Sequence, residues 1–531
     1  MTALLLVFAG LLAAWQPVET HSSTAVVLAG VALLLVPWGW KKTSAEGFRW
    51  VISLVAFWTL FVILGQAGGW DRTEAFAQVF LFGAVGMTVW LASRQIPDTS
   101  LIDIFVLGLV GLAVWGLWQS LGGLDHLRGF TENLPVHLRA GALARIDRGR
   151  AFASMLLPSH LAVVLATTLP ILMVRIKKNL QGVAFAFAFA IGAVGIVATR
   201  SPVGVVLAIA SCSLVLFFRQ RKSFFWAVGV GVMVVAGVIG FRPDVLQNEP
   251  VVLRIDNWGS ALWVWSKAPI VGVGLGGFGQ AAQSIPWPVG NHPVHAHSLP
   301  LEWLADLGLF GLVSWILLTL GFVGVVRRLW RIRPEMAAAL LVIPVHNLVD
   351  FSLYTTGVAL PWAVLLGWSL ALTRQDEEIR EPVSPALRWI GVLAATGAVG
   401  VAILSLSGTV LVEAARGGAS FQTRQDWASQ AAFLAPWSGD AVECVGALAL
   451  ESGNPAMARE ALLFLENRNW QCPRSAARAQ LMGRLAFLAG DEVTGLENLW
   501  RAKVAQPYDE RRRRDFETAS SKLENELNDP R

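Results

Sequence analysis

The chain has 531 residues, of which 55% are hydrophobic and only 15% are charged, and its net charge is +5. Apolar runs of about 20 residues, without alternation of polar and apolar positions, predict transmembrane helices, because a helix satisfies its own backbone hydrogen bonds in lipid. This composition argues against a soluble globular protein, and the small excess of basic residues argues against nucleic acid as a partner.

About 13 apolar segments follow one another along the chain, so the sequence predicts an all-α polytopic membrane protein with about 13 transmembrane helices. The segments lie near 2–15, 24–40, 49–67, 75–93, 101–120, 159–175, 181–198, 202–218, 223–241, 302–326, 335–350, 356–373 and 389–412. We expect residues 1–415 to form the transmembrane catalytic domain, with two long loops at 121–158 and 242–301.

Basic residues cluster in alternate short loops, from Lys41 and Lys42 near the start to Arg374 and Arg380 near the last span. By the positive-inside rule these loops are cytoplasmic. The two long loops, all eight histidines and everything after residue 412 are then expected on the extracytoplasmic side.

From about residue 416 the sequence becomes polar and helical. GALALESGN (446–454) recurs as GRLAFLAGD (483–491), an offset of 37 residues, close to the roughly 34 of a tetratricopeptide unit. We expect 416–531 to be a small α-hairpin, tetratricopeptide-like domain, serving either as a packing domain or as a docking surface for a periplasmic protein partner. Cys444 and Cys472, on adjacent predicted helices, form either a disulfide or two buried thiols.

The chemistry is expected between residues 254 and 312, where RIDNWGSALWVWSKAPIVGVGLGGFGQ is followed by HPVHAHSLPLEWLADLGLFGL. Gly274, Gly276 and Gly279 form a G-x-G-x-x-G pattern, but no βαβ unit surrounds it, so a dinucleotide site is rejected. The glycines instead predict a tight turn or a close approach to a ligand, with backbone N–H groups free to hold an anion.

Three histidines, His292, His295 and His297, stand close together in this stretch. They would either bind a transition metal, although a fourth ligand is lacking, or supply a base to the reaction. We expect the base and no metal or other cofactor. Glu302 and Asp306 are i, i+4 on the following helix, where they either complement the helix dipole or support the site.

His346 and Asp350 form a second i, i+4 pair, at the outward end of another span. An ionisable pair at that depth predicts either a functional site or a structural hydrogen bond. Arg150, Arg200 and Arg254 lie on the same predicted side of the membrane. Planar guanidinium groups suit phosphate oxygens, so the three arginines together predict a pyrophosphate clamp, whereas snorkelling explains any one of them alone.

Several of these motifs resemble the O-antigen ligase and O-antigen polymerase superfamily, which includes bacterial protein O-oligosaccharyltransferases. Arg254-x-x-x-Trp258 leads into GVGLGGFG and then HAHS, with Gly308 and Gly311 downstream. RAFASMLLPSHLA (150–162) resembles an Arg-(x)-Gly-Thr-x-x-x-Pro-Asn pattern, TRSP (199–202) resembles Ser-Arg-Gly, and HNLVDF (346–351) is similar to His-Ser-x-x-Asp-Phe. The resemblance covers roughly 140–375, with departures at Ala153, Ser154, His160, Ser201 and Ser298.

The resemblance implies a metal-independent, GT-C-like membrane glycosyltransferase of a bacterial inner membrane, active on its periplasmic face. Such enzymes pass a glycan from an undecaprenyl-pyrophosphate donor to an acceptor hydroxyl. Carried over to this sequence, His297 would be the catalytic base, and Arg200 and Arg254, with Arg150 nearby, would bind the pyrophosphate. His295, Glu302, His346, Asp350, Gly274 and Gly276 are the expected supporting residues.

The acceptor stays open between lipid A–core, a growing polymer and protein serine. We favour assembly or ligation of O-antigen or exopolysaccharide, in lipopolysaccharide biosynthesis, over protein modification. A transporter or flippase of lipid-linked glycan is the main alternative, because the same arginines would then bind pyrophosphate without bond cleavage. A polysaccharide-export scaffold acting through 416–531 is a third.

Overall fold

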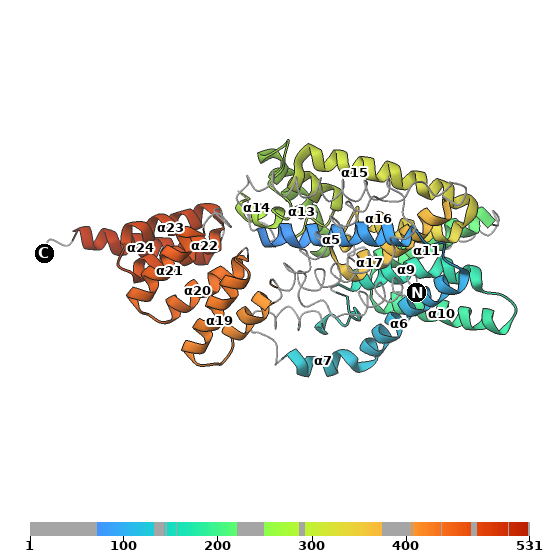
Figure 1. Cartoon of the computed structure of the whole chain (residues 1–531), viewed down its shortest axis with the longest axis horizontal. Coiled ribbons are helices and arrows are strands. Elements are labelled where there is room, and N and C mark those ends of the chain that lie inside the picture. Colours follow the sequence, from blue (N-terminus) through green and yellow to red (C-terminus); the bar gives the residue numbers. More distant parts are fainter. Residues whose placement is uncertain are drawn as a thin grey trace, which may run out of the picture. The chain divides into compact units, whose positions relative to one another are not determined.

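A computed structural model of the whole chain describes residues 72–131, 143, 146–155, 157–219, 249–285, 293–373, 404, 407–436, 438–468, 475–507 and 509–528. Helices dominate these ranges, and no strand occurs in them (Figure 1). The part of the chain that is described is therefore all-α, as the sequence predicts.

The chain forms two compact units. The described residues of the first unit fall within 81–251 and 316–396, and those of the second fall within 55–80, 252–315 and 397–531. The C-terminal helices thus belong to the same compact unit as the glycine- and histidine-rich stretch.

Helix α9 (Pro158–Arg175) lies at the centre of the first unit. It packs against α6 (Thr99–Trp118), α10 (Leu180–Ala198), α11 (Pro202–Arg219) and α16 (Pro334–His346). All its residues from Pro158 to Leu172 are buried. A helix that is buried on every side forms the core of a bundle.

Small residues let these helices approach one another. A Cβ added to Gly195 of α10 would lie 2.6 Å from the Cβ of Ala113, and one added to Gly204 of α11 would lie 2.4 Å from that of Ala162. Because lipid tails are as apolar as leucine, transmembrane helices associate through such close backbone packing. Gly195 and Gly204 are therefore packing positions.

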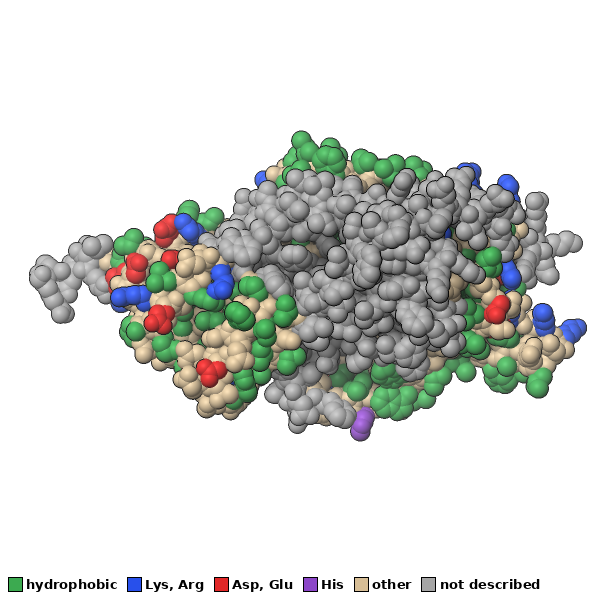
Figure 2. Space-filling model, in the orientation of Figure 1, with side chains coloured by type: hydrophobic (Ala, Val, Ile, Leu, Met, Phe, Trp, Pro, Cys, Tyr) green, Lys and Arg blue, Asp and Glu red, His purple; other side chains and the backbone are tan. Residues whose placement is uncertain are grey.

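Five helices in the described ranges are long and apolar enough to cross a bilayer: those within Thr99–Gly129, Pro158–Arg175, Leu180–Ala198, Leu299–Ile332 and Thr356–Thr373. Helix α15 (Leu299–Ile332) exposes many large apolar side chains, among them Phe310, Leu317 and Leu320, and hydrophobic atoms cover its outer side (Figure 2). The protein is therefore a multi-pass membrane protein, because lipid is the solvent that accepts such a surface.

Eight of the predicted spans coincide with helices of the structure: α5 (Arg72–Ala92), α6, α9, α10, α11, α15, α16 and α17 (Thr356–Thr373). The other five, at 2–15, 24–40, 49–67, 223–241 and 389–412, lie wholly or largely outside the described residues. The total of 13 stays a prediction.

Helix α15 is broken at Gly308, whose φ of 64° and ψ of −148° interrupt the helical hydrogen bonds. The loop that follows α13 (Glu249–Lys267) takes up the released backbone groups: Val273 N donates to Ala305 O, Gly274 N to Asp306 O, and Leu309 N to Pro269 O. The two backbones approach so closely that a Cβ on Gly308 would lie 2.3 Å from Ile270 O. Glycine is therefore required there.

The terminal helices repeat one hairpin. Helices α20 (Gly439–Glu451) and α21 (Pro455–Asn467) turn at Gly453, with φ of 64°, and α22 (Ala476–Leu488) and α23 (Glu492–Ala505) turn at Gly490, with φ of 84°. The Asn454 and Asp491 side chains cap the second helix of each pair. The structure thus has the two hairpins that the sequence repeat predicts, flanked by α19 (Phe421–Leu434) and α24 (Glu510–Asn528). The tetratricopeptide assignment and the 415/416 boundary stay predictions.

Charged side chains are plentiful on the surface of these terminal helices (Figure 2), as expected for a segment in water. Cys444 is a buried free thiol, and burial raises the pKa of this thiol. Its predicted disulfide partner, Cys472, lies outside the described residues.

Replacing Gly308 by alanine should destabilise the protein by more than about 2 kcal/mol, because the new Cβ meets backbone atoms at a conformation reserved for glycine. Gly321→Ala, in the same helix with open space around its Cβ position, is the matched control and should be neutral or gain up to about 1 kcal/mol. Thermal unfolding in detergent measures both. Equal melting temperatures for the two variants would show that the break at Gly308 is not needed.

Candidate functional site

The histidine turn that precedes α15 is held by Glu302. The Glu302 carboxylate accepts the N–H of Ala296 at 2.9 Å and contacts Nδ1 of His295 at 2.7 Å, and its side chain is 1% exposed. A carboxylate in the first turn of a helix is favourably placed to bind N–H groups of the incoming chain. Glu302 therefore fixes the backbone around His297 and orients the His295 ring.

His297 adopts a left-handed backbone conformation, with φ of 52°. Its carbonyl oxygen accepts the indole N–H of Trp258 at 3.1 Å, which ties the turn to α13. Arg254 precedes Trp258 by four residues on the same helix, so the two side chains share a face. The second unit therefore holds His295 and Glu302 in contact and places the His297 turn against Trp258, one helical turn from Arg254; the roles of these residues in a site stay a prediction.

Asp306 performs a role that the sequence did not indicate. It is fully buried, and its carboxylate accepts Gly276 N at 2.7 Å and Phe278 N at 2.8 Å. The expectation that N–H groups of the glycine loop are free to hold a ligand anion is thus wrong for Gly276, and for Gly274, whose N–H binds Asp306 O. The anion that this loop holds is a carboxylate of the chain itself.

In the first unit, Arg150 and Arg200 lie at one junction. Arg150 Nε donates to Thr199 O at 3.0 Å, and Arg200 Nη1 donates to Arg148 O at 3.2 Å. Arg200 has φ of 50° and an exposed side chain. The two arginines therefore each bond across the same junction, between the short α10–α11 turn and the loop before α9; their joint role as a pyrophosphate clamp stays a prediction.

Gln119 anchors the loop that carries Arg150. Its buried carboxamide accepts Phe152 N at 2.9 Å and Ala153 N at 2.7 Å and donates to Ala153 O at 3.2 Å. Gln119 lies at the end of α6, directly before a kink at which Leu121 and Gly122 leave the helical conformation. Ala153 itself has φ of 49°, a conformation that suits the glycine of the pattern it resembles.

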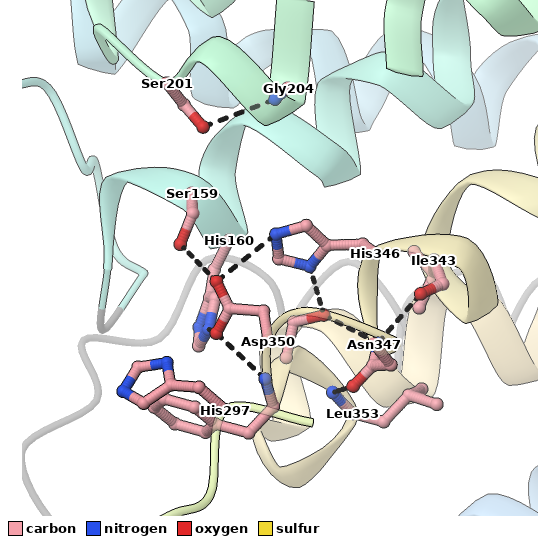
Figure 3. A network of polar contacts seen from close by, with 12 residues as sticks. Ser159, His160, Ser201, Gly204, His297, Ile343, His346, Asn347, Asp350 and Leu353 are labelled. Atoms are coloured by element: carbon pink, nitrogen blue, oxygen red, sulfur yellow. Dashed lines mark hydrogen bonds and ion pairs between the residues drawn. The ribbon is translucent and has the colours of Figure 1, made fainter. Parts of the chain in front are cut away.

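A buried imidazole–carboxylate cluster joins the start of α9 to the end of α16 (Figure 3). His346 Nε2 lies 3.3 Å from one oxygen of Asp350, and His160 Nε2 lies 3.8 Å from the other. The hydroxyl of Ser159 donates to the same carboxylate at 3.2 Å. All four side chains are almost completely buried.

Further polar contacts hold the cluster in place. His346 Nδ1 lies 3.0 Å from Ser352 Oγ, which also accepts a hydrogen bond from Asn347 at 2.9 Å. Sequence reasoning paired His346 with Asp350 but missed His160 as a partner, 190 residues away (350 − 160). Neither local sequence pattern indicates that His160 and Asp350 meet.

The described residues contain no group of three or more His, Cys, Asp and Glu side chains arranged to hold a metal ion. His292, the third histidine of the metal alternative, lies outside the described residues. The predicted site residues thus form two sets, Arg150, Arg200, His346 and Asp350 in the first unit and Arg254, Gly274, Gly276, His295, His297 and Glu302 in the second.

A bundle of lipid-exposed helices that buries ionisable groups and displays arginines defines a multi-pass membrane protein with a polar functional site. A family model described as O-antigen ligase (Wzy_C) matches residues 185–316. This match supports the resemblance to the O-antigen ligase and polymerase superfamily that the motifs indicated, and with it a role in glycan transfer at a membrane. No curated protein matches the chain.

Asp350→Ala should lower the unfolding free energy by about 3 kcal/mol, because it leaves two buried imidazoles without their carboxylate. Asp103→Ala is the matched control. It removes a carboxylate that pairs with Arg175 at 2.8 Å in a less buried position, and should cost about 1 kcal/mol or less. Chemical or thermal unfolding in detergent compares them, and an equal or smaller loss at Asp350 would contradict the structural importance of the cluster.

Proposed function

We propose that this protein transfers a glycan from a polyprenyl-pyrophosphate donor to an acceptor hydroxyl on the periplasmic side of a bacterial inner membrane. His297 acts as the base, and Arg254, Arg200 and Arg150 bind the pyrophosphate. The observation that carries the proposal is the hydrogen bond from Trp258 to His297 O, because it ties the histidine turn to the helix face that also carries Arg254.

Each group suits one part of the reaction. The imidazole removes the proton of the acceptor hydroxyl, whose oxygen then forms a bond to the anomeric carbon of the donor sugar. The bond from that carbon to the phosphate oxygen breaks, and its electron pair leaves with the polyprenyl pyrophosphate. The negative charge that develops on the leaving group is stabilised by fixed guanidinium groups. His295 and Glu302 keep the turn in its catalytic conformation.

Backbone strain supports the assignment. His297 and Arg200 both hold left-handed conformations, with φ of 52° and 50°, and neither is a glycine or an asparagine. Such conformations cost about 1–2 kcal/mol and are retained at sites where the direction of a side chain matters. The strain is in keeping with a fixed base and a fixed cation.

The lipid part of the donor has a suitable place beside Arg200. An apolar groove of about 470 Å³ runs between α9, α10 and α11 and is lined by residues that include Ile196, Val197 and Val205. These residues are within one or two helical turns of Arg200. A groove of this composition would accept an isoprenoid chain whose pyrophosphate lies at the arginine.

The acceptor is proposed to be a glycan or a glycolipid, as in ligation or polymerisation of O-antigen or exopolysaccharide, rather than protein. A flippase of the same lipid would also use the arginines. The distinction lies in His297, since transport breaks no bond and needs no base.

His297→Ala should reduce glycan transfer by at least about 100-fold, because removal of a general base costs that much or more, while binding of the lipid-linked donor is retained. Arg254→Ala should weaken donor binding instead. Purified protein in nanodiscs, a polyprenyl-pyrophosphate glycan and candidate acceptors provide the assay, with product read by mass spectrometry.

His126→Ala, at an exposed position of α7 (Leu124–Phe130) outside the site, is the matched control and should transfer glycan at the wild-type rate. Full transfer activity of His297→Ala would refute the assignment of His297 as the base and would favour the flippase. A product that disappears with a chelator would favour a metal enzyme.

A further inference from the structure

A cavity of about 790 Å³ lies within the second unit, outside the histidine turn and the glycine loop's contact with Asp306. One wall comes from α13 and the short helices that follow the glycine loop, α14 (Phe278–Ala281) and the 3-10 turn Ala282–Ser284. The other wall comes from the repeat helices α20, α22 and α23. A volume of this size holds a ligand of several sugar rings.

The lining combines aromatic faces with neutral polar groups. Two indoles, Trp263 and Trp500, and four carboxamides, Gln280, Gln283, Asn498 and Gln506, border the cavity. An amide offers a donor and an acceptor in one plane, which matches neighbouring hydroxyl groups, and an indole face packs against the C–H side of a pyranose ring. Trp500 is 51% exposed, so its ring is available to a ligand.

The four charged residues that line the cavity are each engaged by another group of the chain. Glu443 pairs with Arg478 at 3.1 Å, Asp440 with Arg416 at 3.6 Å, and Arg501 with Glu497 at 2.5 Å. The ammonium of Lys267 lies 5.0 Å from the centroid of the Trp263 ring. Three of these charges have a partner of opposite sign, and the lining holds two acidic and two basic residues. With no excess of either sign, the lining favours an uncharged, hydroxyl-rich ligand over an anion or a basic peptide.

We propose that this cavity binds an uncharged stretch of oligosaccharide, held between the α13–284 segment and the C-terminal repeats. The inference rests on the proposed glycan transfer and adds a second binding site for the sugar chain, apart from the site of His297. The same chemistry would suit the glycan of the donor and that of the acceptor. It gives the repeats a sugar-binding role in place of the protein docking considered from the sequence.

The test measures binding of the lipid-free repeat-unit oligosaccharide, released by mild acid from the source bacterium's donor glycolipid, to the full-length protein in nanodiscs. Trp500→Ala should weaken binding about tenfold, because it removes one stacking face. Gln283→Ala, on the opposite wall, should also weaken it. Phe433→Ala replaces another aromatic residue of the terminal helices that is 80% exposed and does not line the cavity, and it should bind as wild type.

Wild-type affinity in both Trp500→Ala and Gln283→Ala, or no oligosaccharide binding by the wild type, would overturn the proposal and return the repeats to a protein-docking role. His297→Ala should bind the oligosaccharide normally, so loss of transfer and loss of this site are separate results. In the transfer assay, a higher KM of Trp500→Ala for donor assigns the cavity to the donor glycan, and a higher KM for acceptor assigns it to the acceptor. No change in either KM would contradict the proposal.

Discussion

The candidate site depends on one face of the first turns of α15. Glu302 and Asp306 stand four residues apart there, and each carboxylate holds a different segment: Glu302 holds the histidine turn, and Asp306 holds the glycine loop. Hydrogen bonds from backbone N–H groups to a buried carboxylate are strong and directional. The break at Gly308 allows this, since it releases the carbonyl groups to which the loop attaches.

In the first unit, buried polar side chains likewise connect separate segments of the chain. The Asp350 carboxylate connects α9 and α16 through two histidines and a serine, and the Gln119 carboxamide connects the end of α6 to the Arg150 loop. In a lipid-embedded bundle the hydrophobic effect does not specify helix register, so packing and polar contacts must do so. These contacts fix the junction at which Arg150 and Arg200 meet.

Two of the residues proposed to act in the reaction, Arg200 and His297, hold left-handed backbone conformations. Among the described residues the non-glycine positions with positive φ are Ala153, Arg200 and His297, and all three fall in or beside the motifs that resemble the superfamily. Gln119, Glu302 and Trp258 contact these segments from helices, and their hydrogen bonds offset the free energy of the left-handed conformations. At Arg200 and His297 the left-handed backbone sets the direction of the side chain.

The sequence alone determined the fold class and the candidate residues. Apolar runs of bilayer length admit only helices, and the 37-residue repeat placed both hairpin turns at Gly453 and Gly490. Arg254, Trp258 and His297 suggested one site because the order of these motifs along the chain can be compared with that of the superfamily without knowledge of the fold.

Only the tertiary structure decided which groups meet. His160 and Asp350 are far apart in the chain, and nothing in either local pattern specifies their pairing. The role of Asp306 could not be predicted for another reason. Its carboxylate binds N–H groups of the glycine loop, about 30 residues earlier in the chain, and this loop docks where α15 is broken at Gly308. Sequence periodicity describes continuous helices and does not indicate such a break. The sugar-sized cavity arises from two segments more than 150 residues apart, α13 and the repeats, and only their packing in one unit creates it.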